Sequence, residues 1–349
     1  MAHALQLAAR GLYTTHPNPR VGCVITRNDQ IIGEGWHQRA GTPHAEIHAL
    51  QQAGPAAQGA TVYVTLEPCS HHGRTPPCAA ALIQAGVARV VAAMMDPNPL
   101  VAGSGLDQLK QAGIVTETGL MEAEAHALNP GFVSRMTRQR PWVRLKTAST
   151  LDGKTALASG ASQWITGEAA RADVQHWRAR ACAILTGSGT VLADDPRMTV
   201  RDFDTGRQPL RIIVDSSLRT PPSAAILPAL IACHHADPHA QAALEAAGAE
   251  VVVLPGAEGR VDLDALLDLL AQRGINEIHV EAGATLNGAL LAAGRVDEWV
   301  AYIAPFGLGD HARGLFAMPS VSALADAARF KLADVRQIGD DLRLTLRPR

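Results

Sequence analysis

Four residues in the first half of the chain have the types and the order of a catalytic zinc site. They are His44, Glu46, Cys69 and Cys78. One imidazole and two thiolates leave the fourth tetrahedral position of Zn²⁺ open, which distinguishes a catalytic zinc site from a structural one. Water at such a position ionises near neutral pH, and a neighbouring carboxylate can carry its proton. The residues therefore predict zinc-assisted hydrolysis, with Glu46 as the proton shuttle.

The spacing of the two cysteines leaves several interpretations open. Zinc-dependent nucleobase deaminases carry H-x-E and, downstream, P-C-x-x-C, whereas eight residues separate Cys69 from Cys78 in "EPCSHHGRTPPC" (67–78). This segment could be a damaged metal site, a disulfide, or a deaminase site with an insertion between its ligands. The cysteines could also be small buried hydrophobic residues, with His44 as a helix cap. Four matching residues in the right order argue against that last interpretation.

The predicted elements around these residues would bring them together. Pro43 opens a helical pattern that closes on Gly54, and prolines at 76 and 77 open another, so His44, Glu46 and Cys78 fall at helix starts. Cys69 is expected at the end of the strand pattern "GATVYVTLEP" (59–68). A hairpin with its turn at 28–29 precedes them. The alternation of strands and helices predicts an α/β/α sandwich, with helices on both faces of a sheet.

Length and composition predict a two-domain protein that acts on small molecules. A chain of 349 residues is long for one core, and weak periodicity near 129–142 divides it into expected domains 1–142 and 143–349. The formal net charge of −2 gives no reason to expect binding to nucleic acid or to a membrane surface. There is neither an apolar run of about 18 residues nor a signal-peptide pattern at the start, so we expect a cytoplasmic protein with reduced thiols.

The second half predicts another α/β domain, whose site is harder to find. We expect strands in the segments 142–149, 182–188, 210–215, 249–255, 277–283, 298–305 and 342–347, and helices around 168–181, 237–247, 262–273 and 285–293. The common G-x-G-x-x-G fingerprint is absent. "VEAGATLNGALL" (280–291) has a strand, a turn with Gly283 and Gly288, and then a helix, so it could offer amides to a pyrophosphate. Packing explains such glycines equally well, and "GSGTVLADDP" (187–196) is either a ligand loop or an ordinary loop.

Nearly the whole chain resembles the bacterial bifunctional deaminase–reductases of riboflavin biosynthesis. The motifs that carry the resemblance are "HPNPRVGCVI", "GWHQRAGTPHAEIHAL", "VTLEPCSHHGRTPPC", "MDPNPLVAGSG", "LKTASTLDGKTALASGASQWIT", "TVLADDPRMTVR", "IVDSSLRT" and "VEAGATLNGALL". That family has P-C-x8-C in its deaminase domain, so the resemblance accounts for the gap between the cysteines. It makes the inserted "SHHGRTPP" a candidate substrate loop.

The resemblance implies a fold and two reactions. The fold would be a cytidine-deaminase-like α/β/α sandwich followed by a dihydrofolate-reductase-like α/β domain that uses NADPH. Zn²⁺ would be held by His44, Cys69 and Cys78, with Glu46 as the catalytic residue. The substrate would be 2,5-diamino-6-ribosylamino-4(3H)-pyrimidinone 5′-phosphate, which would lose its 2-amino group. Reduction of the ribosyl to a ribityl group would then give 5-amino-6-ribitylaminouracil 5′-phosphate. A homo-oligomer, dimer or tetramer, is also implied.

The resemblance also implies the remaining site residues. Those that match substrate positions of the deaminase are Asn18, His37, His71 and Arg74. Those that match NADPH positions are Ala148, Trp164, Thr190, Asp194, Ser216, Gly283, Ala284, Thr285, Leu286, Asn287 and Gly288. Those that match substrate positions of the reductase are Ser162, Arg178, Met198, Arg201 and Glu281.

Several of these residues have ordinary structural alternatives. Asn18 could only shape a turn, His37 could be a surface residue at a strand end, and Arg74 could be a solvated loop charge. Trp164 could be a core aromatic residue. Two other functions also stand beside the bifunctional enzyme: a tRNA or nucleoside deaminase with an unrelated second domain, and a metal-stapled nucleotide sensor. The net charge counts against the first, and an open zinc position beside Glu46 counts against the second.

Overall fold

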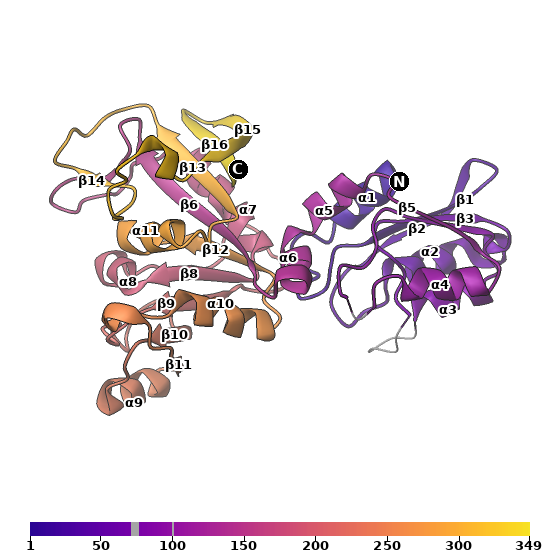
Figure 1. The fold of residues 1–349 in the computed structure, drawn as a ribbon, viewed down its shortest axis with the longest axis horizontal. Helices are drawn as coiled ribbons and strands as arrows, with labels where there is room; N and C mark the ends of the chain where they lie inside the picture. Colours follow the sequence, from indigo (N-terminus) through magenta and orange to yellow (C-terminus); the bar gives the residue numbers. More distant parts are fainter. Residues whose placement is uncertain (71–76, 100) are drawn as a thin grey trace. The chain divides into compact units, whose positions relative to one another are not determined.

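The computed structural model describes residues 1–70, 77–99 and 101–349, which form two units, Met1–Arg140 and Pro141–Arg349 (Figure 1). The boundary between the units falls two residues before the predicted division after residue 142. Among the described residues, no helix is both long enough and apolar enough to span a bilayer.

The first unit is built on a sheet with the strand order β2-β1-β3-β4-β5. The strands of this sheet among the described residues are β1 (Gly22–Arg27), β2 (Gln30–Trp36), β3 (Thr61–Val64), β4 (Arg89–Ala92) and β5 (Val115–Thr118). β1 and β2 form the predicted hairpin, and its turn residues Asn28 and Asp29 both have positive φ, as a two-residue hairpin turn requires. β3, β4 and β5 run parallel, so their carboxyl ends share one edge.

Helices cover both faces of this sheet, as predicted (Figure 1). They are α1 (Ala2–Ala9), α2 (Ala45–Ala53), a 3-10 turn (Gly54–Ala57), α3 (Cys78–Gln84), α4 (Ser104–Gln111), α5 (Glu122–Leu128) and α6 (Pro130–Arg138). Successive residues of β1 face opposite sides: Val24 packs with Leu7 of α1, whereas Cys23 and Ile25 pack with Ala49 of α2. Each layer therefore has its own apolar contact with the sheet.

The segment expected to be a seam with weak periodicity, 129–142, contains a helix. α6 begins with Pro130 in its first turn and buries Phe132 in the core of the first unit. A proline at a helix start and apolar residues at 132, 133 and 136 are a helical signal. The basic residues of the segment obscured it.

The second unit is built on a mostly parallel sheet with the strand order β11-β10-β9-β8-β12-β6-β13-β16-β15. Its strands are β6 (Trp142–Thr150), β8 (Ala183–Gly187), β9 (Leu210–Val214), β10 (Leu230–Cys233), β11 (Glu250–Val253), β12 (Glu277–Glu281), β13 (Glu298–Ala304), β15 (Phe330–Ile338) and β16 (Asp341–Pro348). Only β15 and β16 pair antiparallel to their neighbours. β7 (Lys154–Ala156) and β14 (Arg313–Gly314) form a separate two-stranded sheet.

Helices again cover both faces of the sheet. They are α7 (Glu168–Arg180), α8 (Ser188–Asp194), α9 (Pro238–Ala246), α10 (Leu263–Gln272) and α11 (Ala284–Ala292), with 3-10 turns at Ala257–Gly259 and Leu324–Asp326. Leu270 of α10 and Leu290 of α11 pack on one face. Val174 of α7 packs on the other face, with Tyr302 of β13. The predicted strands and helices are all present, whereas β7, β10, β14, β15 and α8 were not predicted.

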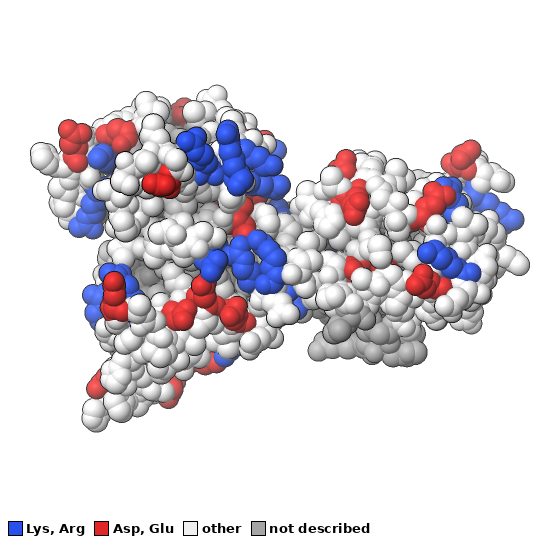
Figure 2. Space-filling model, viewed as in Figure 1, with Lys and Arg blue, Asp and Glu red and all other residues white. Residues whose placement is uncertain are grey.

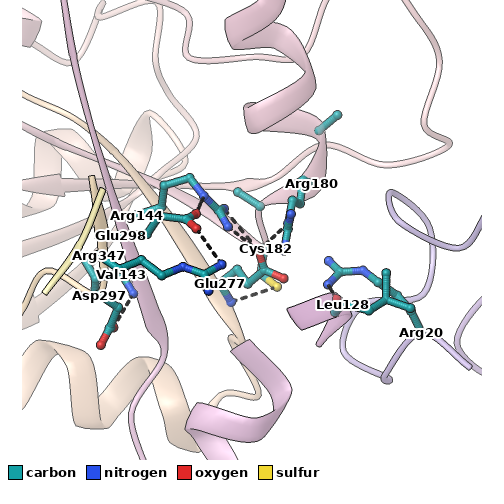
Figure 3. A network of polar contacts seen from close by, with 12 residues as sticks. Arg20, Leu128, Val143, Arg144, Arg180, Cys182, Glu277, Asp297, Glu298 and Arg347 are labelled. Atoms are coloured by element: carbon teal, nitrogen blue, oxygen red, sulfur yellow. Dashed lines mark hydrogen bonds and ion pairs between the residues drawn. The ribbon is translucent and has the colours of Figure 1, made fainter. Parts of the chain in front are cut away.

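The face of the sheet beneath α7 also carries buried charge, beside the apolar cluster of Val174 and Tyr302. Arg144 of β6 is 0% exposed and donates through Nε to Glu298 of β13 at 2.5 Å and through both terminal nitrogens to Glu277 of β12 at 3.2 Å. Arg180 also donates to Glu277, and Arg347 to Glu298 (Figure 3). A buried charge is tolerated only when it is paired, and this network, called the Arg144 network below, provides such pairing.

Candidate functional site

Three side chains of the first unit lie at the separations that a bound Zn²⁺ requires. Nδ1 of His44 is 3.6 Å from Sγ of Cys69 and 3.3 Å from Sγ of Cys78, and the three ligand atoms lie within 4.8 Å of one another. Tetrahedral zinc with ordinary Zn–N and Zn–S bond lengths places such ligand atoms roughly 3.5–3.8 Å apart. The set therefore fits zinc, and the five cysteines of the chain are all free thiols, so the disulfide alternative is wrong.

Local structure explains how the ligands meet. His44 is the N-cap of α2 and Cys78 is the first residue of α3, as predicted. Cys69 was expected at a strand end, but β3 ends at Val64 and Cys69 lies in the following loop. The amide of Cys78 donates to Sγ of Cys69 at 3.3 Å, and the amide of Ala79 to its carbonyl at 3.1 Å. The start of α3 thus holds the loop that carries the second thiol.

Glu46 lies in the first turn of α2, beside this ligand set. Its side chain is 3% exposed, and Oε2 has no hydrogen-bond partner among the described residues. Burial and the negative charge of Cys69 raise the pKa of the Glu46 carboxyl to about 7. Hydrogen bonds from Cys78 and His44 lower the pKa of Cys69 below its usual value, which favours the thiolate that binds metal. A carboxyl group poised near neutral pH is suited to taking and giving a proton.

Asn18 and His37 lie beside the zinc ligands. Nδ2 of Asn18 is 3.0 Å from Nε2 of His37, and the His37 ring makes an edge contact with the His44 ring at 5.2 Å between centroids. His37 is 2% exposed, so the alternative of a surface residue is wrong. Burial lowers the pKa of His37 to about 4, so the ring is neutral. With its proton on Nδ1, facing the carbonyl of Pro43 at 3.3 Å, His37 can accept the Asn18 amide.

Two further residues position this site and were not predicted from the sequence. Asn129 accepts from the amide of Arg20 at 2.8 Å and donates to its carbonyl at 2.9 Å, which holds the segment that follows Asn18. Glu67, two residues before Cys69, accepts from four backbone amides, those of Asp96, Gly103, Gly105 and Leu106. Glu67 stands inside a motif that carries the family resemblance, but its partners are distant in sequence. His71 and Arg74 lie outside the described residues.

The second unit brings together three of the predicted substrate residues. Arg178 of α7 donates to both carboxylate oxygens of Glu281 at the end of β12, at 2.5 and 3.0 Å. It also lies 3.7 Å from Sδ of the buried Met198. Although burial opposes ionisation, Arg178 and His279 hold the pKa of the Glu281 carboxyl well below its usual value. Arg178 therefore does not cover a helix face in water; its charge is paired with a carboxylate.

Most of the predicted NADPH residues lie near or after the carboxyl ends of the parallel strands. Ala148 lies near the end of β6, Thr190 and Asp194 lie on α8 after β8, and Ser216 follows β9. A Cβ atom added at Gly283 would lie 3.9 Å from Oγ1 of Thr190, so the segments after β8 and β12 approach each other. Ligands of open α/β sheets bind at this edge.

The segment 283–288 is not the turn that the sequence suggested. Gly283 is the N-cap of α11, and residues 284–288 form its first turns. Leu286, Asn287 and Gly288 are buried, and a Cβ atom at Gly288 would clash with the carbonyl oxygen of Ala317 at 2.3 Å. Gly288 therefore serves packing, which leaves the start of α11 as the part of this segment that can face a ligand. "GSGTVLADDP" likewise contains α8 and is not a loop.

The remaining predicted residues lie on exposed segments. Trp164 is 68% exposed, so the alternative of a core aromatic residue is wrong, and the Arg171 guanidinium lies 4.6 Å from its ring centroid. Ser162 is half-buried on the same segment. The Arg201 side chain is exposed, and its backbone amide donates to Gln175 of α7 at 3.0 Å.

The fold and the two sites define a class: a two-domain enzyme in which a cytidine-deaminase-like domain precedes a reductase domain. Residues 1–94 match the cytidine and deoxycytidylate deaminase zinc-binding region, and residues 141–344 match the RibD C-terminal domain. The chain belongs to the RibD family of riboflavin-biosynthesis proteins. It is accordingly a bifunctional enzyme with a deamination and a reduction step, which confirms the function and fold class predicted above.

Relatives of known sequence and structure support this assignment over nearly the full length. The riboflavin biosynthesis protein RibD of Escherichia coli K12 is 53% identical, with 99% of this chain and 98% of that protein aligned. That of Haemophilus influenzae is 48% identical, with 100% and 96% aligned. The solved structure of Acinetobacter baumannii RibD, form 2, has a TM-score of 0.92 at 49% identity and covers 100% of this chain and 97% of that one. A Thermotoga maritima diaminohydroxyphosphoribosylaminopyrimidine deaminase/5-amino-6-(5-phosphoribosylamino)uracil reductase has a TM-score of 0.88 at 32% identity, with 100% and 97% covered.

Proposed function

We propose that this protein deaminates 2,5-diamino-6-ribosylamino-4(3H)-pyrimidinone 5′-phosphate and then reduces the ribosyl group of the product, with Zn²⁺ and NADPH as cofactors. The observation that carries the proposal is the zinc-compatible set of His44, Cys69 and Cys78 beside a buried Glu46. The name of the Thermotoga relative supports the choice of substrate. A cytoplasmic location and a homo-oligomeric state, dimer or tetramer, stay predictions.

In the deamination step, His44, Cys69 and Cys78 would hold Zn²⁺. When bound, the ion would lower the pKa of a water molecule at its open position. Glu46 would take a proton from the attacking water and give it to the amino group that leaves as ammonia, so the carboxyl returns to its starting state. Asn18, held against the neutral His37, would orient the pyrimidine through its amide. His71 and Arg74 would complete the substrate contacts.

In the reduction step, the predicted residues at the carboxyl edge of the second sheet would hold NADPH, which supplies hydride when bound. Glu281 would face the ribosyl substrate as a carboxylate, because Arg178 pairs with both of its oxygens. Arg201 is exposed, whereas Arg178 is already paired with Glu281, and a guanidinium binds phosphate through two parallel hydrogen bonds, so Arg201 is the better candidate for the 5′-phosphate. Ser162 and Met198 would complete the substrate contacts. In this assignment Arg178 positions the carboxylate of Glu281, and Arg201 binds the phosphate.

The surface favours a small substrate over a nucleic acid. On the face shown in Figure 2, acidic and basic side chains are interspersed over the first unit, and basic side chains gather near β15 and β16 of the second. An RNA-editing deaminase would need a basic surface around its zinc site. The net charge of −2 agrees with the small-molecule interpretation.

Removing zinc should separate the two reactions. After chelation, we expect deamination to fall to background, while reduction of chemically pre-deaminated substrate continues, because the described zinc ligands all belong to the first unit. Adding Zn²⁺ back should restore deamination. Both rates are measured on the same preparation by product chromatography. Full deamination by protein shown to contain no metal would contradict the proposal.

A further inference from the structure

His279 is a buried histidine to which the proposed reaction gives no role. It lies on β12 between Glu277 and Glu281, and alternate residues of a strand share one face, so the three side chains lie beneath α7. Its side chain is 0% exposed, and neither ring nitrogen has a hydrogen-bond partner among the described residues. An unpartnered buried polar group is costly and rare in native proteins, so its presence requires an explanation.

The imidazole of His279 lies within ion-pair distance of the carboxylate of the proposed reductase site. Nε2 of His279 lies 3.5 Å from Oε1 of Glu281. Arg178 holds the same carboxylate from α7 and is itself held by the carbonyl of Thr199 at 3.0 Å. Glu281 therefore lies between a guanidinium and an imidazole. A shift of about half an ångström would bring the second contact to hydrogen-bond length.

The surrounding charges favour a neutral imidazole that donates. The charged groups facing this pair are Arg178 from α7 and Arg144 and Lys146 from β6, and Lys146 lies opposite Glu281 in the strand register. β8 contributes the uncharged Thr186, whose hydroxyl donates to the Glu281 carbonyl at 2.7 Å. Burial lowers the pKa of His279, and Arg144 and Arg178 lower it further against the opposing effect of Glu281. A neutral ring has a single N–H, and the Nε2 tautomer directs it at Oε1.

We propose that His279 is a positioning residue for the reduction step: its Nε2–H holds Oε1 of Glu281, so that the carboxylate keeps one orientation towards the ribosyl substrate. This inference rests on the proposed role of Glu281. Arg178 holds the carboxylate from α7, whereas His279 would hold it from β12, so the two donors together fix the carboxylate relative to the sheet. The unpartnered imidazole is then a donor that lies 3.5 Å from the carboxylate oxygen that it serves.

The test compares two substitutions in the full-length enzyme. His279→Phe fills the space without a donor, and His279→Gln keeps an N–H that can reach the carboxylate. Reduction of pre-deaminated substrate is followed by NADPH oxidation across pH. A hydrogen bond to a charged group contributes enough to predict a loss in kcat of roughly 10- to 100-fold for His279→Phe. The acid limb of kcat/KM should move to higher pH, because Glu281 without this donor is protonated more easily. His279→Gln should recover most of the rate, and deamination should be unchanged in both variants.

Two results would overturn the inference: His279→Phe with the parent rate and pH profile, or His279→Gln as slow as His279→Phe, which would indicate packing alone. If His279→Phe does not fold, as judged by loss of NADPH binding, His279→Asn takes its place, since its shorter side chain cannot reach Oε1. A third variant, Glu281→Gln, distinguishes a failure of this inference from a failure of the proposed function. Normal reduction by Glu281→Gln would refute the proposed site, whereas loss of reduction there together with an unaffected His279→Phe would refute only the role of His279.

Discussion

Glu46→Gln is expected to abolish deamination while leaving zinc content and reduction at the level of the parent protein. The amide cannot take a proton from water, and positioned acid–base groups contribute about 10²–10⁴-fold to rate. We therefore expect a loss of roughly three orders of magnitude in deamination, measured as ammonia release at saturating substrate. The substitution keeps the size of a fully enclosed side chain, so the packing around α2 should not change.

The control for this substitution is Glu34→Gln in the same unit. Glu34 lies on β2 and is half-buried, with an ion pair to His3 at 2.7 Å. Glu34 has the same carboxylate group but takes no part in the proposed chemistry. Both reactions of Glu34→Gln should therefore proceed at parent rates. Survival of deamination in Glu46→Gln would contradict the proposed mechanism. A variant that loses zinc as well as activity would instead show that Glu46 supports the metal site.

Arg144→Leu is expected to destabilise the second unit by about 3–5 kcal/mol, because it leaves two buried carboxylates without their shared partner. Those carboxylates belong to Glu277 and Glu298, which Figure 3 shows around Arg144. Glu277 is 1% exposed and Glu298 is 5% exposed. Arg180 would remain hydrogen-bonded to Glu277 and Arg347 to Glu298, but neither takes the place of the guanidinium that lies between the two carboxylates. The free energy of unfolding is measured by denaturant titration with tryptophan fluorescence. Trp142, Trp164, Trp177 and Trp299 lie in the second unit, so the signal reports mainly on that unit.

Arg273→Leu provides the matched control in the same unit. Arg273 donates to both carboxylate oxygens of Glu250, so its pair resembles the buried one in chemistry, but the two side chains are 34% and 55% exposed. Surface pairs contribute about 0–1 kcal/mol. Equal effects of the two substitutions would contradict the view that burial of the Arg144 network, rather than the number of its hydrogen bonds, determines its importance.

The parts of the site that sequence could predict are those carried by local patterns. His44, Glu46 and Cys78 stand at helix starts marked by prolines, and short motifs place them within one turn of the observed positions. Cys69 was expected on a strand because its flanking residues alternate, but the loop around it is held by the start of α3. The contact between Asn18 and His37 joins two segments through tertiary structure alone.

Long-range pairing explains what the sequence of the second half could not reveal. Arg178 and Glu281 are 103 positions apart, and nothing near either residue indicates that one is the partner of the other. β15 was missed because both of its faces are largely exposed, so no alternation marks it. The glycine at 288 suggested a ligand turn, whereas it permits the close approach of Ala317 to a helix. Glycine alone does not distinguish these two roles.

The most direct test of the whole account is the product mass formed from the diaminopyrimidinone ribotide, with and without NADPH. Without NADPH, we expect one species, in which an amino group is replaced by oxygen. With NADPH, that species should gain two hydrogens, which places deamination before reduction. Absence of the deaminated product from zinc-loaded protein would contradict the assigned substrate. A deaminated product that never gains hydrogen would contradict the assignment of the second unit as an NADPH-dependent reductase.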